Sequence, residues 1–236
     1  MKRSDFRFAD PLRVRWAEVD MQKVVFNGHY LMYVDTAVGN WWRALALPYE
    51  QTLAALGGDL FVRKATLDYL APARYDDTLE VGIRFAGAGT SSLRVVAAVF
   101  RDAELLVHGE IVYVWTDAAT QRPQPVPAAL VDALRAHEAG EAMVDVQVGA
   151  WSELASEAQA IRTRVFVEEQ KVPVEIERDA ADAGAVHALA RNRLGLAVGT
   201  GRLLAADGPG PPARIGRMSV ARGLRGANIG RAVLEA

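Results

Sequence analysis

The sequence DMQKVVFNGHYLMYVD, residues 20–35, decides how the first half of this chain folds. It places the carboxylate of Asp20 shortly before Asn27, a residue type that is favoured at helix N-caps, and an apolar segment follows. The first N–H groups of such a helix have no partner inside it and carry partial positive charge. A carboxylate beside that helix end suits chemistry in which an oxygen gains negative charge, such as attack on a carbonyl.

The segment after Asn27 has the apolar period of a helix. Apolar residues recur every three or four positions, which predicts about five helical turns that Pro48 brings to an end. The apolar stripe is wide, so we expect other structure to surround this helix. Upstream, Leu12, Val14 and Trp16 alternate with arginines, the pattern of a strand with one buried face.

An antiparallel sheet is predicted after a short helix at residues 49–56. Four segments have strand character: 60–69, 78–86, 91–101 and 104–116. Their links are short, and this requires antiparallel neighbours because a parallel pair needs a long crossover. Prolines from Pro123 onward end the sheet, and a helix is expected over 128–142. The first half is therefore expected to be an α+β domain whose sheet curls around the long helix.

Composition narrows the class of function. With 51% hydrophobic residues the chain can bury real cores, and its net charge of -2 gives no reason to expect nucleic acid. No basic run indicates a membrane surface, and no segment has the length of a membrane span. The absence of cysteine excludes disulfides and thiolate nucleophiles, and four scattered histidines lack the spacing of a metal site. The N-terminus acquires acidic residues before any apolar run, which argues against a signal peptide. We expect a cytoplasmic protein that acts on small molecules without a metal.

Asp20, His29 and Tyr30 are the candidate catalytic residues. The carboxylate of Asp20 can attack a carbonyl directly or act as the base that activates water, and the sequence leaves both routes open. His29, on the first turn of the helix, could donate to a substrate or to Asp20. The plain alternative is that Asp20 only caps a turn and that His29 is structural.

The segment VRWAEVDMQKVVFNGHYLMYVDTA, residues 14–37, resembles the opening of the 4-hydroxybenzoyl-CoA thioesterase family, and the resemblance extends over about residues 8–137. It implies a hot-dog fold, in which an antiparallel sheet wraps a long helix, assembled as dimers or tetramers with sites between subunits. It also implies hydrolysis of acyl-CoA thioesters without a further cofactor, with Asp20 as the catalytic carboxylate. The family usually has glycine where this chain has Lys23, which could limit access or pair with Asp20 or a CoA phosphate.

The last segment, RMSVARGLRGANIGRAVLEA at residues 217–236, resembles motif A of the GNAT acyltransferases, in which a strand leads into a glycine-rich loop and a helix. Upstream, RVFVEEQKVPVEIERDAAD followed by His187 is similar to one GNAT branch, so the resemblance covers about residues 151–236. It implies acetyl-CoA as cosubstrate, cradled by backbone N–H groups. The expected binding residues are Met218, Val220, Arg225, Gly226, Ala227, Asn228 and Gly230. Asn228 replaces the middle glycine, and the domain is expected to be incomplete because the motif stops within its helix.

These observations predict three parts. Residues 1–142 are expected to form a hot-dog thioesterase domain, 143–150 a linker, and 151–236 a partial GNAT α/β domain with strands near 186–190, 196–204 and 213–220 and a turn at 207–212. The expected activity is hydrolysis of an acyl-CoA by a homodimer or homotetramer. Two alternatives stay open: a non-catalytic module that binds acyl-CoA, and an acyltransferase that uses the hot-dog domain for oligomerisation.

Overall fold

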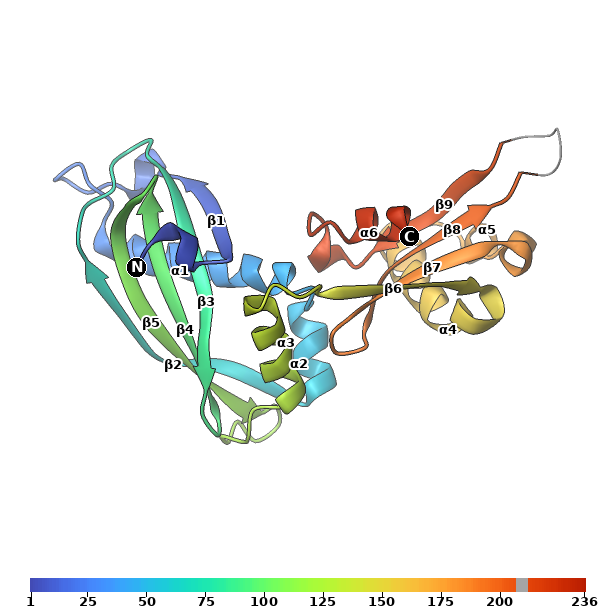
Figure 1. The fold of residues 1–236 in the computed structure, drawn as a ribbon, viewed down its shortest axis with the longest axis horizontal. Helices are drawn as coiled ribbons and strands as arrows, with labels where there is room; N and C mark the ends of the chain where they lie inside the picture. Colours follow the sequence, from blue (N-terminus) through green and yellow to red (C-terminus); the bar gives the residue numbers. More distant parts are fainter. Residues whose placement is uncertain (207–211) are drawn as a thin grey trace. The chain divides into compact units, whose positions relative to one another are not determined.

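The computed structural model describes residues 1–206 and 212–236 of the chain. The turn expected at 207–212 therefore falls almost entirely outside the described residues. The chain divides into two compact units (Figure 1). Unit 1 contains residues 1–45 and 49–141, and unit 2 contains residues 46–48 and 142–236.

Unit 1 is one antiparallel sheet with a long helix against it. Its elements are the 3-10 helices η1 (Arg3–Asp5) and η2 (Trp16–Glu18), the helices α1 (Asn27–Ala44), α2 (Tyr49–Leu56) and α3 (Ala128–Glu138), and the strands β1 (Phe8–Arg13), β2 (Gly58–Tyr69), β3 (Thr78–Ala88), β4 (Ser92–Arg101) and β5 (Glu104–Asp117). The strand order is β1-β3-β4-β5-β2, and every pair is antiparallel. The expected antiparallel sheet and the long helix from Asn27 are confirmed.

Helix α1 packs against β1, β3 and β4 (Figure 1). Its buried face carries Tyr30, Val34, Ala37 and Trp41, each at most 2% exposed. The opposite face is open within unit 1, because Leu31 is 42% and Met32 57% exposed. The expectation that other structure surrounds the helix is therefore correct for one side only.

The first strand ends earlier than the alternating pattern predicts. Strand β1 stops at Arg13, and Trp16 lies in η2 with 75% of its surface exposed. The cause is local, since the N–H of Arg15 donates to the Glu18 carboxylate at 2.7 Å and so closes a 3-10 turn. The alternation of apolar residues continues past Arg13, but a side-chain cap takes the backbone donor that a strand ladder needs.

In the described part of unit 2, four strands form an antiparallel sheet in the order β6-β7-β8-β9. The elements of this unit are β6 (Val144–Ala150), α4 (Trp151–Arg162), the π-helix η3 (Thr163–Glu169), α5 (Val174–Glu177), the 3-10 helix η4 (Ala180–Gly184), β7 (Val186–Asn192), β8 (Ala197–Leu204), β9 (Arg214–Val220), the 3-10 helix η5 (Arg222–Leu224) and α6 (Ile229–Glu235).

The linker expected at residues 143–150 is wrong for most of its length, because 144–150 form strand β6. This strand pairs with β7 from Val144 opposite Asn192 to Ala150 opposite Val186. Its valines alternate with Asp145 and Gln147, which is a strand pattern of period two. The helix expected over 128–142 is also too long, since α3 ends at Glu138.

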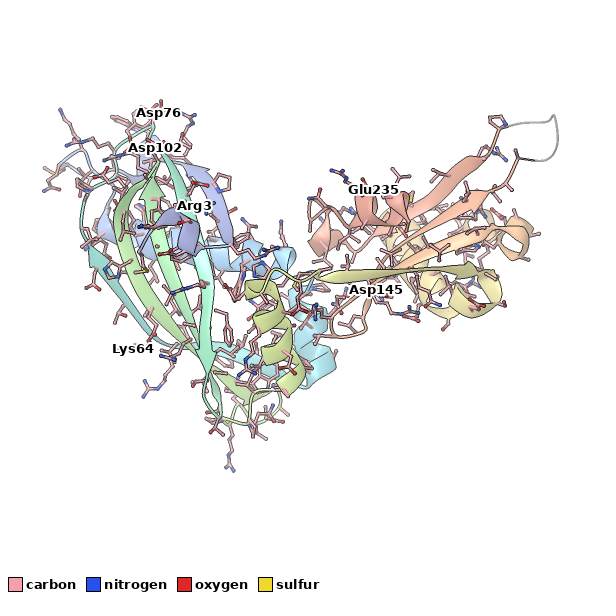
Figure 2. The ribbon with its side chains drawn as sticks, in the orientation of Figure 1. Arg3, Lys64, Asp76, Asp102, Asp145 and Glu235 are labelled. Atoms are coloured by element: carbon pink, nitrogen blue, oxygen red, sulfur yellow. The ribbon has the colours of Figure 1, made fainter. Side chains whose placement is uncertain are left out.

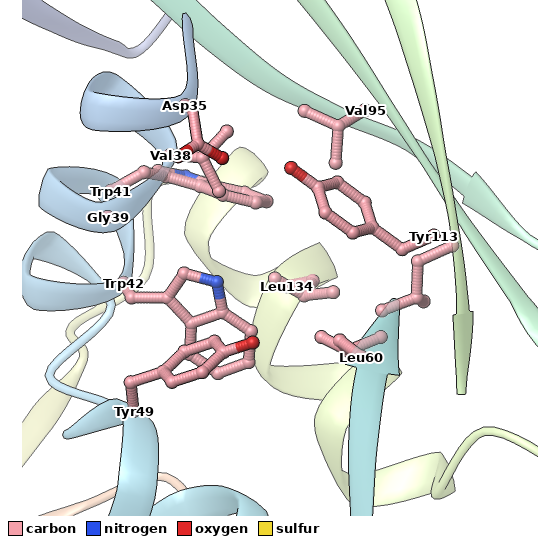
Figure 3. Close-up of a pocket in the computed structure, with 11 residues that line it drawn as sticks. Asp35, Val38, Gly39, Trp41, Trp42, Tyr49, Leu60, Val95, Tyr113 and Leu134 are labelled. Carbon is pink, nitrogen blue, oxygen red and sulfur yellow. The ribbon is translucent and has the colours of Figure 1, made fainter. Parts of the chain in front are cut away.

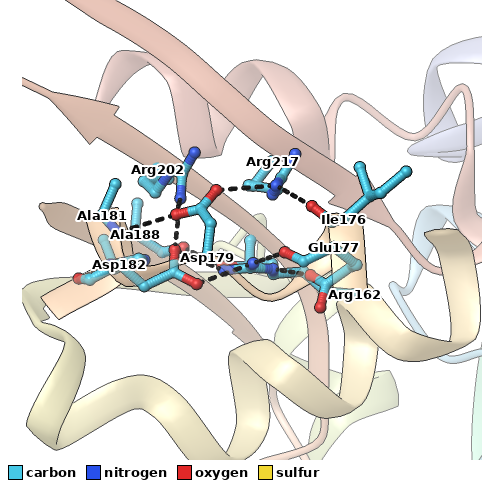
Figure 4. A network of polar contacts seen from close by, with 11 residues as sticks. Arg162, Ile176, Glu177, Asp179, Ala181, Asp182, Ala188, Arg202 and Arg217 are labelled. Carbon is cyan, nitrogen blue, oxygen red and sulfur yellow. Dashed lines mark hydrogen bonds and ion pairs between the residues drawn. The ribbon is translucent and has the colours of Figure 1, made fainter. Parts of the chain in front are cut away.

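A network of buried charges holds the segment from α5 to η4 against the sheet of unit 2 (Figure 4). Arg162, 1% exposed, donates to Glu177 and makes two 2.9 Å hydrogen bonds to the two carboxylate oxygens of Asp182. Arg202 donates to Asp182 at 2.8 Å and to Asp179 at 2.7 Å. Burial raises the pKa of Asp182, but the hydrogen bonds from the two arginines outweigh this effect and leave it lowered.

Candidate functional site

Asp20 lies in a tight turn between η2 and α1. Its backbone N–H donates to the carbonyl of Val24, and its own carbonyl accepts from the N–H of Lys23, both at 2.9 Å. Its carboxylate oxygen Oδ1 accepts from the backbone of Gln22 at 2.9 Å and from that of Val24 at 3.4 Å. Asp20 thus caps its own turn, and these bonds also fix the direction of a half-buried carboxylate.

Lys23 adopts a left-handed backbone with φ of 63°. This conformation suits glycine better than lysine, because a residue with a Cβ is strained at positive φ and glycine is not. The side chain of Lys23 is exposed, and it makes no ion pair with Asp20 among the described residues. The departure from the family pattern therefore costs backbone strain without neutralising the carboxylate.

The turn is anchored to α1 through Glu18, a residue that no sequence pattern singled out. Its carboxylate is 4% exposed and accepts hydrogen bonds from the Tyr33 hydroxyl and from the N–H and side chain of Arg15, all at 2.7 Å. The carbonyl of Glu18 accepts from the N–H of Phe26 at 2.9 Å. Burial raises the pKa of Glu18, but the hydrogen bonds from Arg15 and Tyr33 lower it by more. Glu18 therefore ties both ends of the Asp20 turn to the helix.

Helix α1 begins without a side-chain cap. The N-cap residue is Phe26, not Asn27 as the sequence suggested, because Asn27 is already helical and Phe26 has extended ψ. The backbone N–H groups of Asn27 and Gly28 donate to no group among the described residues. A Cβ added at Gly28 would lie 2.8 Å from the Phe26 ring, so glycine lets this ring lie over the helix end. The start of α1 therefore presents two backbone N–H donors that a ligand can bind.

A cavity of about 430 Å³ joins Asp20 to this helix start. It is lined by Asp20, Val24, Val25, Phe26, Asn27, Tyr30, Tyr69, Leu70, Ala71 and Pro72. A few polar groups among mostly apolar residues are the usual composition of a small-molecule site. The hydroxyl of Tyr69 donates to the carbonyl of Asn27 at 3.1 Å and so ties the end of β2 to the first residue of α1.

Of the three expected catalytic residues, the cavity brings together Asp20 and Tyr30. Tyr30 is 2% exposed, and its hydroxyl accepts a 2.8 Å hydrogen bond from the N–H of Ala73, which leaves its own proton free to donate. Burial raises the pKa of Tyr30, so the phenol stays protonated. His29 is not among the lining residues. Its ring stacks on Tyr33 at 6.5 Å, and its Nδ1 is buried with no partner among the described residues.

Asn27 is the lining residue that sequence reasoning used only as a cap. It is exposed and lines the same cavity as the Asp20 carboxylate. Its position in the sequence could have indicated this role, because the first residue of a helix lies beside the free backbone N–H groups. No group of three or more acidic or histidine side chains that could hold a metal ion occurs within residues 1–206 and 212–236.

The residues expected to bind acetyl-CoA lie on β9, in the loop that follows it and at the start of α6. Met218 and Val220 on β9, together with Ala227, are half-buried and pack against the cluster of Val198, Leu224, Ile229 and Val233. Gly226 and Asn228 lie in a loop with φ of 91° and 60°. Arg225 is paired with Glu169 through bonds of 2.6 and 2.7 Å, and Gly230 lies in the first turn of α6.

No helix in the described part of the chain is long and apolar enough to cross a membrane.

Comparison with known proteins places unit 1 in a family. Residues 14–134 match the family model of the thioesterase-like superfamily. The acyl-CoA thioester hydrolase YbgC of Escherichia coli O6:H1 is 30% identical over 125 residues, which are 52% of this chain and 92% of that protein. A thioesterase of Thermus thermophilus, solved with coenzyme A and Zn, is 29% identical with a TM-score of 0.50, over 57% of this chain and 97% of its own.

A second solved structure, the PA5185 protein from Pseudomonas aeruginosa strain PAO1, is 28% identical with a TM-score of 0.50, over 57% of this chain and 94% of its own. These matches confirm the hot-dog thioesterase fold that the resemblance implied for the first half of the chain. An antiparallel sheet against one long helix, a carboxylate fixed beside the start of that helix and a family match over residues 14–134 agree, and the chain belongs to the thioesterase-like superfamily.

Proposed function

We propose that unit 1 hydrolyses acyl-CoA thioesters to a free acid and CoA at the Asp20 cavity. The observation that carries this proposal is that Asp20 and Asn27 line the same cavity. The backbone N–H groups of Asn27 and Gly28, at the start of α1, have no hydrogen-bond partner among the described residues. A thioester carbonyl needs both a nucleophile on its carbon and donors on its oxygen. The acyl-CoA thioester hydrolase YbgC, with 30% identity, supports the choice of substrate class.

In this mechanism the thioester oxygen accepts hydrogen bonds from the start of α1, where the helix dipole stabilises the charge that develops. The Asp20 carboxylate either attacks the carbonyl carbon to give an anhydride, which water then opens, or takes a proton from the water that attacks. In both routes the C–S bond breaks and the CoA thiolate receives a proton. Tyr30 and the Asn27 amide supply donors for the substrate or the water, and His29 has no step because it does not line the cavity.

Release of free thiol from a panel of acyl-CoAs tests this proposal. Asp20→Asn keeps the turn hydrogen bonds of an Oδ atom but removes the charge, and we expect a loss of at least about 100-fold in kcat. Asp132→Asn changes an exposed carboxylate on α3 that does not line the cavity, and it serves as the matched control. If no chain length gives release that depends on Asp20, the non-catalytic acyl-CoA-binding alternative holds instead.

A single turnover in ¹⁸O-labelled water distinguishes the two roles of Asp20. If the carboxylate is the nucleophile, water opens the anhydride and part of the label enters the side chain of Asp20, where mass spectrometry of its peptide detects it. If the carboxylate is the base, all of the label enters the released acid.

The hot-dog assembly is a further part of the proposal. Large apolar side chains are exposed on α1 (Met32, 57%) and on β2 (Phe61, 44%, and Val62, 56%), and β2 lies at the edge of the sheet. Figure 2 shows Lys64 of the same strand projecting away from the sheet. We infer that these surfaces are covered in a homodimer or homotetramer. Light scattering at micromolar concentration should give two or four chains, and Val62→Glu should give monomers. A monomeric wild type contradicts this inference.

We also propose that unit 2 binds acetyl-CoA as a GNAT-type N-acetyltransferase domain. The left-handed Gly226 and Asn228 turn the loop after β9, and their N–H groups donate to no group among the described residues, an arrangement suited to a pyrophosphate. Calorimetry with acetyl-CoA on the Asp20→Asn protein should show a site that Asn228→Gly retains and Asn228→Ala weakens, because alanine resists positive φ. Equal binding by both variants contradicts the assignment.

A further inference from the structure

A second cavity in unit 1, of about 300 Å³, lies beside the C-terminal half of α1 (Figure 3). It is lined by Asp35, Val38, Gly39, Trp41, Trp42, Tyr49, Leu60, Leu93, Val95, Tyr113 and Leu134, none of which lines the Asp20 cavity. Its volume is at the lower end of the roughly 300–1,000 Å³ of small-molecule sites. From Asn27 to Val38 the helix rises about 16 Å, so a short acyl group held at Asp20 does not reach this cavity.

The charge of this cavity is carried by one residue. Asp35 is the single ionised group among its lining residues, it is exposed at the rim, and it makes no hydrogen bond or ion pair within the described part of the chain. No lysine or arginine lines the cavity. Burial, and then the charge of Asp35, raises the pKa of Tyr113, so the phenol stays neutral beside the carboxylate. The site therefore disfavours anions such as CoA and has an unused acceptor for a cation.

The walls are aromatic. Trp41, Trp42, Tyr49 and Tyr113 contribute their rings, and Trp42 and Tyr49 meet edge to face at 5.1 Å and 85°. Figure 3 shows the hydroxyl of Tyr113 pointing toward Asp35, and this hydroxyl has no hydrogen-bond partner in the described chain. Aromatic rings beside a carboxylate are the usual surroundings of organic ammonium ions, because the ring quadrupole and the carboxylate both attract the positive charge.

We propose that this cavity binds a small organic ammonium ion with an apolar body. The ammonium group donates to the Asp35 carboxylate and to the oxygen of Tyr113, and the body fills the space between the aromatic rings and the aliphatic wall of Val38, Leu60 and Leu134. The site is distinct from the proposed thioesterase site, because the two cavities share no residue.

Three probes with the same body and different charge test the proposal on the full chain: phenethylammonium, 2-phenylethanol and 3-phenylpropanoate, each titrated by calorimetry and by tryptophan fluorescence. Phenethylammonium should bind at one saturable site at least about tenfold more tightly than the alcohol, and the carboxylate should be weakest. In Asp35→Asn this preference for the amine should disappear. Asp132→Asn, an exposed carboxylate on α3 outside the cavity, is the matched control and should leave the affinity unchanged.

Two further variants locate the site. A Cβ at Gly39 meets nothing within 4 Å, so Gly39→Leu can place its side chain in the cavity and should abolish binding of all three probes. Asp20→Asn should bind phenethylammonium as the wild type does. The proposal is overturned if no probe binds, if amine and alcohol bind equally, if Asp35→Asn keeps the preference, or if a long-chain acyl-CoA displaces the amine.

Discussion

The hydroxyl of Tyr33 donates a 2.7 Å hydrogen bond to the carboxylate of Glu18, fifteen residues earlier, and both groups are buried. This bond joins α1 to the 3-10 turn that precedes Asp20. Because the carbonyl of the same Glu18 also accepts from the N–H of Phe26, one residue positions the turn and the helix start together. The geometry of the Asp20 cavity therefore depends on a residue that does not line it.

Tyr33→Phe removes only the hydroxyl from this contact. A hydrogen bond to a charged group contributes about 1.5–3 kcal/mol, and the loss of one partner leaves the buried Glu18 less well satisfied, so the free energy of unfolding should fall by that amount. Urea unfolding at pH 7 measures the change. Tyr75→Phe removes an exposed hydroxyl with no hydrogen-bond partner among the described residues and should shift stability by less than about 0.5 kcal/mol. Equal effects of the two variants contradict this account.

Glu18 should also make stability depend on pH. Its pKa in the folded chain is below the ordinary value of 4.5, so its contribution is complete above about pH 4.5 and is lost as the pH falls through the lowered pKa. Glu18→Gln should be less stable than the wild type at pH 7, and the difference should shrink as the pH is lowered below that value. Denaturant midpoints of both proteins across pH 3–7 test this, and a constant difference contradicts it.

Lys23→Gly should stabilise the protein. A non-glycine residue at a left-handed φ of 63° is strained by about 1–2 kcal/mol, of which the entropy of glycine offsets roughly half, so a gain of about 0.5–1 kcal/mol is expected. Lys23→Ala removes the charged side chain but keeps the Cβ, and it should give no such gain. If both variants are stabilised equally, the side chain rather than the backbone is the cause.

Alanine at two glycines of α1 should have different effects: at Gly39 it should raise stability, and at Gly28 it should weaken substrate binding. Gly39→Ala adds a methyl group into open space and improves helix propensity, so unfolding should cost about 1 kcal/mol more with unchanged thioester kinetics. Gly28→Ala brings a Cβ within 2.8 Å of the Phe26 ring, which lines the Asp20 cavity and must move. Its KM for acyl-CoA should rise. Unchanged kinetics in Gly28→Ala would show that the ring does not shape the site.

Arg162→Met should unfold unit 2 at much lower denaturant concentration. The substitution keeps most of the volume but leaves Glu177 and Asp182 buried without their main partner, which costs about 3–5 kcal/mol. Trp151 is the single tryptophan of residues 142–236, and its ring lies 5.2 Å from the Arg162 guanidinium, so its fluorescence reports on this unit. Arg231→Met breaks an exposed pair with Glu235 and should cost less than about 1 kcal/mol.

Helix α1 and the strands of unit 1 could be predicted because their apolar patterns continue over many residues. The start at Asn27 and the span of α2 follow from patterns of neighbouring residues. The errors occur where a short-range contact competes with the pattern. Trp16 continues an alternating run, yet the bond between Arg15 and Glu18 makes a 3-10 turn. The alternation of β6 is short, and Gly140 before the strand and Gly149 inside it suggested a linker instead.

The candidate site was predictable only in part, for a related reason. Asp20 and Tyr30 are close to one helix start in sequence, so local reasoning found them. Glu18 is held by Tyr33, fifteen residues later, and Tyr69 reaches the start of α1 from the end of β2. A local sequence pattern does not reveal contacts between residues so far apart in the chain. The second cavity combines Asp35 of α1 with Tyr113 of β5, which only the folded sheet brings together.

Helix α1 contributes to the Asp20 cavity through Asn27 and to the second cavity through Val38. An 18-residue helix moves as one rigid body, so a ligand that shifts α1 when it enters the second cavity displaces the donors at Asn27 by the same amount. Thermodynamic linkage then requires that acyl-CoA bound at Asp20 change the affinity for that ligand by an equal factor. The shared helix is a mechanical connection by which an amine could change the affinity for acyl-CoA.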